Sequence, residues 1–323
     1  MSIRFGIAER LVLLLVIKMI ETSRSIKMDN LLETLEISEL ELKRYALRAE
    51  KNYHELHRLK KSGKTRRVVA PSAELKGLQR KISRRILRHH DLQDSCTGYR
   101  PGHSIVTNAR PHTGKRFVLN IDLKDFFPSI SFNRVVGLYQ NLGMDRNAAR
   151  LLARATTYKG ALPQGAPTSP DIANLVCRTL DKRLEGFCKI RQWSYTRYCD
   201  DITISGDTCT DGAMDTLRTI IESEGFRINE DKTRMRMSHQ RQTVTGVVDN
   251  ERPNLEISER RKLRTICHQL RWNPESFEGL GKKLMGSLSF ANMIGGLLRK
   301  SEFQSAWRLL KKKHHEARHA STT

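Results

Sequence analysis

The segment from residue 195 to residue 205, Tyr-Thr-Arg-Tyr-Cys-Asp-Asp-Ile-Thr-Ile-Ser, most constrains the fold of this chain. It places Asp200 and Asp201 between two runs of strand-forming residues, which predicts a strand, a tight turn and a second strand. At such a turn both carboxylates can lie at one edge, where they repel each other beside Ile202 and Ile204. A divalent cation with oxygen ligands would relieve this repulsion. Taken alone, however, the pair is better explained as an ordinary turn that faces solvent.

A third acid follows another apolar run. Residues 117 to 122, Phe-Val-Leu-Asn-Ile-Asp, are typical of a strand that ends at Asp122, where a buried carboxylate is costly unless it is coordinated or paired. If Asp122 lies beside the Asp200–Asp201 turn, three carboxylates can hold two metal ions roughly 3.5–4 Å apart, the arrangement used for in-line phosphoryl displacement. Asp125 is a weaker candidate for direct ligation and fits better in a turn that offers backbone N–H groups to phosphates.

The charge balance indicates the partner. Among 323 residues the chain has 58 lysines and arginines against 35 acids, a formal charge of +23. Such an excess concentrates polyanions at the surface, so nucleic acid is the first partner to test, although a solvated basic surface without a partner is not excluded. The six cysteines form no C-x-x-C pair, which favours reduced thiols in the cytoplasm. The apolar run at residues 11–17 is too short to span a bilayer, so we expect a buried helix and no membrane.

The pattern along the chain predicts an α+β fold. Residues 1–60 are expected to be helical, with a capping box at Ser38, and the C-terminal part from residue 257 is expected to be helical and basic. Strands are expected at residues 64–69, 117–122, 195–205 and 243–248. Further helices are expected at residues 74–90, 133–158, 171–187 and 215–224, with loops at 98–112 and 160–170.

Three motifs in series resemble the palm of reverse transcriptases: the segment around Asp122, then Leu-Pro-Gln-Gly at residues 162–165, then Tyr-Cys-Asp-Asp at residues 198–201. The resemblance implies a right-hand polymerase fold with fingers, an antiparallel palm sheet and a helical thumb. The expected divisions are an N-terminal helical extension, fingers with an insertion, a palm that contains part of the fingers at 133–170, and a basic thumb: residues 1–55, 56–115, 116–248 and 249–323.

The resemblance also implies roles for single residues. Asp122, Asp200 and Asp201 match the catalytic acids that bind two Mg²⁺ ions. Phe127 matches the aromatic residue that blocks a 2′-hydroxyl on the incoming nucleotide. The full set expected to contact the deoxynucleoside triphosphate is Lys64, Arg66, Asp125, Phe126, Phe127, Gln164 and Lys232. Arg67, next to Arg66, is an alternative to it as the residue that clamps the triphosphate. A place in the core is an alternative for the phenylalanines, and is more plausible for Phe126 than for Phe127. Lys232 is as readily a surface lysine as a general acid toward pyrophosphate.

Two further segments are similar to signatures of bacterial retron reverse transcriptases, namely Asn-Ala-Arg-Pro-His at residues 108–112 and Val-Thr-Gly at residues 244–246. The segment at residues 286–290 is similar to a thumb segment of the same group. The residues expected to contact RNA are Asn108, His112, Val244, Thr245, Gly246, Arg260 and Arg264. Taken alone, Asn-Ala-x-x-His is better explained as the start of a capped helix.

The retron resemblance implies an RNA-directed DNA polymerase that copies part of a structured noncoding RNA (msr–msd) into branched, RNA-linked DNA (msDNA), primed by an internal guanosine 2′-hydroxyl. It further implies a host RNase H for template removal, an effector or toxin protein from the same locus and a role in defence against phage. Two alternatives are an intron or diversity-generating reverse transcriptase and a non-catalytic RNA-binding or toxin-restraining protein on a polymerase scaffold. Met28 is an alternative initiator.

Overall fold

The computed structural model describes residues 27–59, 63, 65–272, 281–295 and 301–320. The expected helix at residues 11–17 and Lys64 therefore lie outside the described residues. The chain forms two compact units, each assembled from separate segments of the sequence. The first unit consists of residues 1–93, 124–180 and 223–227, and the second of residues 94–123, 181–222 and 228–323.

The first unit is mainly helical. Its α-helices are α2 (Met28–Leu35), α3 (Glu39–Leu47), α4 (Ala73–Arg85), α6 (Phe126–Ser129), α7 (Phe132–Asn141), α8 (Arg146–Thr156) and α9 (Ser169–Val176). Short 3-10 turns lie at η1 (Ala49–Asn52) and η2 (Leu87–His89). The capping box at Ser38 is confirmed, because its side chain accepts from the Glu41 N–H and the Glu41 carboxylate accepts from the Ser38 N–H.

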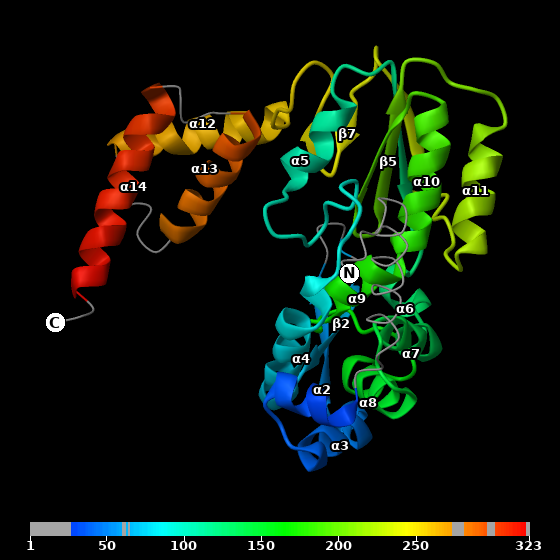
Figure 1. Ribbon diagram of the computed structural model, residues 1–323. Coiled ribbons are helices and arrows are strands. Elements are labelled where there is room, and N and C mark those ends of the chain that lie inside the picture. The colour runs from blue at the N-terminus through cyan, green and yellow to red at the C-terminus, as the bar shows by residue number, and fades with distance from the viewer. Residues whose placement is uncertain (1–26, 60–62, 64, 273–280, 296–300, 321–323) are drawn as a thin grey trace, which may run out of the picture. The chain divides into compact units, whose positions relative to one another are not determined.

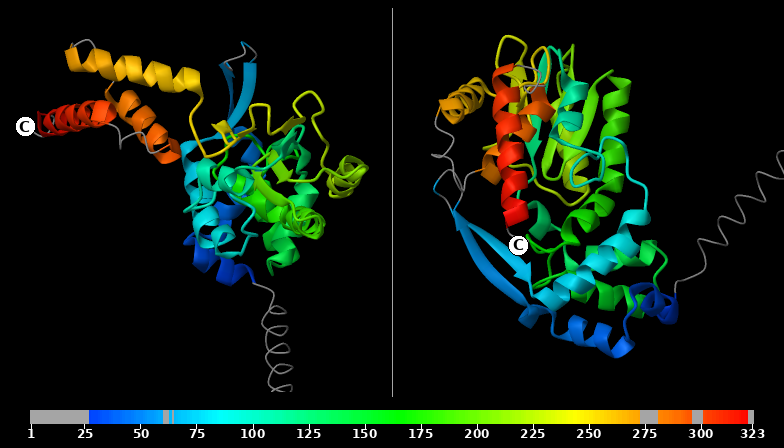
Figure 2. Two further views of the ribbon diagram at one scale, coloured as in Figure 1. Left: turned by 90° about the horizontal axis from the view of Figure 1, so that it is seen from above. Right: turned by 90° about the vertical axis from the view of Figure 1, so that its left-hand side faces the viewer.

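The expectation of helix throughout residues 1–60 is wrong at its end. Residues 53–59 form strand β1 (Tyr53–Leu59), which pairs antiparallel with β2 (Thr65–Pro71) in a two-stranded ribbon, visible in blue in Figure 2. The proline–glycine loop contacts this ribbon, since the Val69 N–H donates to the Gln164 carbonyl at 2.9 Å. A Cβ on Gly165 would lie 2.7 Å from the Val69 oxygen, and its φ is +138°, so this close approach requires glycine.

The second unit is built on an antiparallel sheet of four strands in the order β4-β5-β3-β6. These strands are β3 (Phe117–Asp122), β4 (Ser194–Tyr198), β5 (Asp201–Gly206) and β6 (Arg234–Met237). Helices α10 (Arg178–Ile190) and α11 (Ala213–Ser223) lie on one side of the sheet, and α5 (Ile105–Ala109), followed by η3 (Arg110–His112), lies on the other side with β7 (Figure 1). The strand–turn–strand expected at residues 195–205 is confirmed as β4 and β5.

The strand expected at residues 243–248 is a small hairpin instead of one strand. Its arms are β7 (Thr243–Val244) and β8 (Val247–Val248), and the two loop residues both have positive φ, 48° for Thr245 and 83° for Gly246. Positive φ at both central positions is the geometry of the two-residue turn that matches strand twist. The sequence pattern missed it because each arm is only two residues long.

The C-terminal part is helical, as expected. Helices α12 (Ile257–Trp272), α13 (Gly281–Gly295) and α14 (Ser301–Ala320) pack against one another around an apolar core that includes Leu263, Cys267, Leu288, Phe303 and Leu310. Among the helices of the described ranges, none is both long and apolar enough to cross a membrane.

Candidate active site

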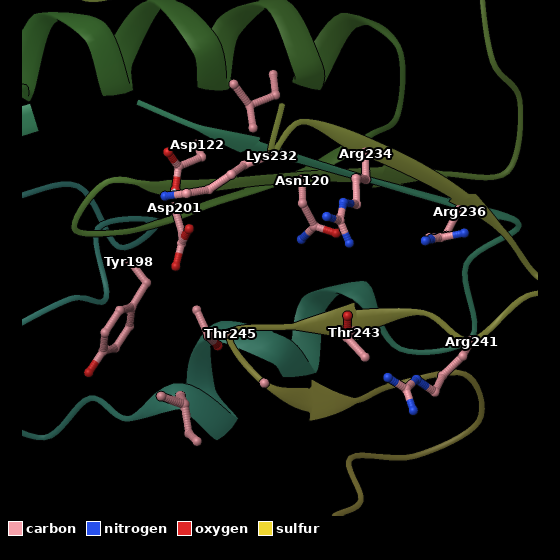
Figure 3. Close-up of a pocket in the computed structure, with 13 residues that line it drawn as sticks. Asn120, Asp122, Tyr198, Asp201, Lys232, Arg234, Arg236, Arg241, Thr243 and Thr245 are labelled. Carbon is pink, nitrogen blue, oxygen red and sulfur yellow. The ribbon is translucent and has the colours of Figure 1, made fainter. Parts of the chain in front are cut away.

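The three expected acids meet at one end of the sheet in the second unit. Strands β3 and β5 are paired so that Asp122 lies directly opposite Asp201, and the Leu123 N–H donates to the Asp200 carbonyl at 2.9 Å. Figure 3 shows the Asp122 and Asp201 carboxylates near each other, with the Lys232 ammonium beside them. The two segments that the sequence motifs singled out thus converge, as the hypothesis required.

Two side chains hold Asp122. The Lys232 Nζ lies 2.7 Å from Asp122 Oδ1, and the Asn229 Nδ2 donates to Asp122 Oδ2 at 2.9 Å. The hydrogen bond to Asp122 raises the pKa of Lys232, so this lysine is paired with an acid of the site and is not an isolated surface residue. Sequence reasoning missed Asn229, although it stands three residues before Lys232 in a segment already identified as a motif.

The negative charges crowd Asp201. Burial, and after it the charges of Asp200 and Asp122, raise the pKa of Asp201 to about 6, while Lys232 acts in the opposite direction. The donor set consists of hard carboxylate oxygens, and a divalent cation would relieve the repulsion among them, so these residues fit such an ion. Over the described ranges, no three acidic, histidine or cysteine side chains are grouped in a way that could hold a metal ion, and the Lys232 ammonium pairs with Asp122 instead.

A buried ion pair supports the turn that carries the acids. Arg197 and Asp181 are both fully buried and form a two-pronged pair, with Nε–Oδ1 and Nη2–Oδ2 distances of 2.7 Å. The same guanidinium donates from Nη1 to the Cys199 carbonyl at 3.1 Å. Because Cys199 has a left-handed φ of 63°, this bond ties a strained position of the turn to the interior.

A strap at residues 95–99 closes over the same turn. The Arg197 N–H donates to the Ser95 carbonyl at 2.8 Å, and the Thr97 N–H donates to the Arg197 carbonyl at 2.9 Å. At Gly98 an added Cβ would lie 2.5 Å from the Cys199 nitrogen, so only glycine allows the two backbones to approach this closely. The geometry of the acidic turn is thus set by residues about a hundred positions earlier in the chain.

The structure gives Asn108 and His112 an internal place instead of the expected contact with RNA. Both side chains are fully buried. The Asn108 Oδ1 accepts from the Thr97 hydroxyl at 2.6 Å, and the His112 ring bridges the hydroxyls of Ser205 and Thr196 at 2.7 and 2.8 Å. With no surface to offer a ligand, the two residues join the strap to β4 and β5, and burial lowers the pKa of His112 to about 3.

Of the remaining residues expected to contact RNA, one is buried and the others are exposed or line a cavity. Val244 is fully buried in the apolar core, so its side chain cannot reach a ligand, whereas Thr245 and Gly246 line a cavity that also contains Asp122 and Asp201. On α12, Arg260 lines a separate cavity of about 760 Å³ and Arg264 is exposed.

The residues expected to contact the nucleotide, other than Lys232, belong to the first unit. Asp125 is exposed with a left-handed φ of 48°, and Phe126 and Phe127 are buried, with Phe126 stacked on Phe226 at 5.6 Å between ring centroids. Gln164 is half-buried. Arg66 lies on β2.

The structure mixes helices with an antiparallel sheet that pairs an acid at one strand end with an Asp-Asp turn, and sequence comparison gives the class of protein. The family model for reverse transcriptase (RNA-dependent DNA polymerase) matches residues 59–281, so the chain belongs to the reverse transcriptase family, whose members use divalent metal ions.

The relatives define the kind of reverse transcriptase. The chain is 38% identical over 223 residues to the retron Ec86 reverse transcriptase of Escherichia coli, with 67% of this chain and 70% of the relative covered. It is 38% identical over 257 residues to the retron Mx65 reverse transcriptase of Myxococcus xanthus, covering 73% of this chain and 60% of the relative. Against the retron Mx162 enzyme of the same organism the identity is 33%, covering 72% and 56%. The chain is a bacterial retron reverse transcriptase, an RNA-directed DNA polymerase.

Proposed function

We propose that this enzyme copies part of a structured noncoding RNA into branched, RNA-linked DNA, using deoxynucleoside triphosphates and two Mg²⁺ ions. One observation carries the proposal. Asp122 lies opposite Asp201 in the β3–β5 register, next to Asp200, in a chain that belongs to the retron reverse transcriptases. Three carboxylates at one sheet end are the donor set that two-metal phosphoryl transfer needs.

In this mechanism Asp122, Asp200 and Asp201 would hold the ions, which would lower the pKa of the attacking hydroxyl and neutralise charge on the leaving pyrophosphate. Asn229 orients the Asp122 carboxylate by donating to its Oδ2 at 2.9 Å. Lys232 offsets part of the negative charge of the acids before substrate arrives, and its ammonium is the nearby proton donor for the pyrophosphate oxygen.

We assign residues 56–115 to the fingers, 116–248 to the palm with a fingers portion at 133–170, and 249–323 to the thumb. Lys64, Arg66 and Gln164 would then clamp the incoming triphosphate and its sugar. Asp125 sits in a left-handed turn before α6, where backbone N–H groups are available to phosphates.

Phe126 and Phe127 are both buried in the first unit. The stacking of Phe126 on Phe226 gives it a core role, which leaves Phe127 as the residue that excludes a 2′-hydroxyl on the incoming nucleotide. The Phe126 ring packs edge-to-face against the Phe127 ring and so supports it in this position.

The relatives' designation as retron enzymes supports the remaining steps. The template is an RNA from the same locus, and an internal guanosine 2′-hydroxyl primes synthesis to give a 2′,5′ branch. Thr245, Gly246, Arg260 and Arg264 are the proposed RNA contacts, since they are exposed or line cavities. A host RNase H removes the copied template, and the RNA–DNA–protein complex restrains an effector protein in defence against phage. We place this DNA synthesis in the cytoplasm.

Primer extension with purified protein tests the chemistry. Asp200→Asn and Asp201→Asn should abolish deoxynucleotide incorporation on a homopolymer template with Mg²⁺, while RNA binding stays within a few-fold of wild type. Asp211→Asn, which removes an exposed carboxylate on a loop of the same unit, is the matched control and should retain full activity. A wild-type protein that incorporates nothing would identify a non-catalytic scaffold, and Asn variants that lose their fold would make the acids structural.

Sequencing the nucleic acid that co-purifies with the protein tests the substrate. A DNA joined to an internal guanosine of one defined RNA is the expected result. Unbranched DNA with a free 5′ end, or a random set of cellular RNAs, would contradict the proposed template and priming.

A further inference from the structure

A basic slot leads away from the catalytic acids within the second unit. It is a cavity of about 650 Å³ that has Asp122, Asp201 and Tyr198 at one end and three arginines, Arg234, Arg236 and Arg241, farther along. Figure 3 shows the two ends of this slot and the open space between them. The proposed catalytic steps involve none of these three arginines.

The floor of the slot is the sheet itself. Strand β6 pairs with β3 so that Arg234 lies opposite Asn120 and Arg236 opposite Val118. Residues two apart on a strand point to the same face, so both guanidinium groups belong to the face that carries Asn120 and Asp122. Their separation along the strand is roughly 6.5–7 Å, which is close to the spacing of neighbouring phosphates on a nucleic-acid strand.

The roof of the slot is the β7–β8 hairpin together with α5. Thr243, Thr245 and Gly246 line it, and Ile105 adds an apolar contact. In Figure 3 the Thr243 hydroxyl faces Asn120 and Arg234 across the cavity, so hydroxyl and amide groups lie on both sides of a positively charged channel. Polar groups of this kind can hydrogen-bond the sugars of a strand whose phosphates are held by arginine.

Acidic side chains of the slot do not neutralise the positive charge of Arg234 and Arg236 in the described part of the chain. The acids that line it are Asp122 and Asp201 at its catalytic end, and within the described ranges neither Arg234 nor Arg236 forms an ion pair. Arg241, by contrast, is paired with Glu256 at 2.9 Å. Two unneutralised guanidinium groups beside the acids are therefore available to an anionic ligand that extends along the sheet.

We propose that Arg234 and Arg236 bind two consecutive backbone phosphates of the primer strand, the strand whose hydroxyl attacks in the reaction. This inference rests on the proposed function. The strand lies between the β3–β6 floor and the Thr243–Gly246 roof, and its reactive end reaches Asp122 and Asp201. The shared ligand chemistry is a phosphodiester backbone, supplied by RNA at initiation and by DNA after the first additions.

Salt-dependent binding gives the first test. Binding of an RNA template annealed to a DNA primer is measured by fluorescence anisotropy at several salt concentrations, without nucleotides. Each of Arg234→Gln and Arg236→Gln should weaken binding about tenfold and reduce the slope of log Kd against log salt by roughly 0.7–0.9. Arg234→Lys should keep most of the slope because the charge remains. Arg183→Gln, exposed on α10 across the sheet, is the matched control and should leave the slope unchanged.

Neutral linkages identify the strand. Methylphosphonates are placed one at a time in the primer or in the template, and binding by wild type and by Arg234→Gln is compared. A neutral primer linkage that weakens binding by the wild-type protein but not by Arg234→Gln would locate the contact, since the neutral linkage and the substitution then remove the same interaction. Coupling to template linkages, or to none, would overturn the inference.

Primers made of RNA or DNA distinguish the two sources. Equal loss of slope on both primers shows that the two arginines recognise phosphate, as proposed, and a loss confined to one sugar type would contradict the proposal. The outcome is separable from that of the proposed function: unchanged slopes with an active wild type refute only the slot, whereas changed slopes with an inactive wild type refute only polymerisation.

Discussion

Replacing Arg197 by methionine should separate the stability of the protein from the geometry of its acidic turn. In the single variant the Asp181 carboxylate stays fully buried without its partner. Removing one partner of a buried ion pair costs about 3–5 kcal/mol, a large part of the roughly 5–15 kcal/mol that typically stabilises a folded protein. We therefore expect Arg197→Met to lower the unfolding temperature substantially while the protein still folds at low temperature.

The double variant Arg197→Met/Asp181→Asn is designed to recover that stability. Asparagine is neutral, and its side-chain oxygen can still accept the hydrogen bond that the Tyr195 hydroxyl donates to Asp181 at 2.7 Å. Neutralising the partner removes the uncompensated charge, so most of the lost unfolding free energy should return. The bond from Arg197 to the Cys199 carbonyl does not return, because methionine has no donor.

In the double variant kcat should stay low, because the hydrogen bond to Cys199 is still missing, even though the unfolding free energy recovers. A hydrogen bond from a charged group contributes about 1.5–3 kcal/mol, so its loss can lower kcat by roughly 10–100-fold if the turn needs it to present Asp200 and Asp201. Urea unfolding and single-nucleotide incorporation measure the two quantities. Arg191→Met, which removes a guanidinium stacked on Phe187, is the control and should keep wild-type kcat. A double variant with recovered stability and wild-type kcat would refute the positioning role of Arg197.

Three further predictions concern single residues. Phe127→Ala should admit ribonucleotides and reduce sugar discrimination in kcat/KM by more than roughly tenfold; unchanged discrimination would exclude it from the gate. Gly98→Ala should destabilise the protein by about 1–3 kcal/mol and lower kcat, because its Cβ would meet the Cys199 nitrogen, whereas Gly77→Ala, with nothing within 4 Å, should not; equal unfolding temperatures would contradict this. His112 is buried with its pKa lowered to about 3, so only the unfolded state binds its proton between pH 6.5 and 3. Stability should fall as pH decreases through that window, by up to about 1.4 kcal/mol per unit, and His112→Gln should flatten the profile measured by urea unfolding.

Local patterns in the sequence were enough to predict the strands and the turn that carry the three acids. An apolar run that ends in Asp122 and a strand–turn–strand around Asp200 and Asp201 are properties of short segments, because strand propensity and turn formation depend on neighbouring residues. The basic balance of the chain indicated nucleic acid for a similar reason, since net charge is a sum over residues and needs no fold. The capping box at Ser38 is local in the same sense, and it is confirmed.

Tertiary structure decided which side chains face a ligand and which support those that do. Asn108 and His112 stand in a motif associated with RNA, yet both are fully buried against β4, β5 and the strap. Arg197 looked like one more basic residue, and only packing removed it from solvent and placed it between Asp181 and Cys199. Apart from the bond between Arg197 and the nearby Cys199, these contacts join residues 11 to 93 positions apart. No local pattern encodes them, because burial is a property of the assembled fold and not of any one segment.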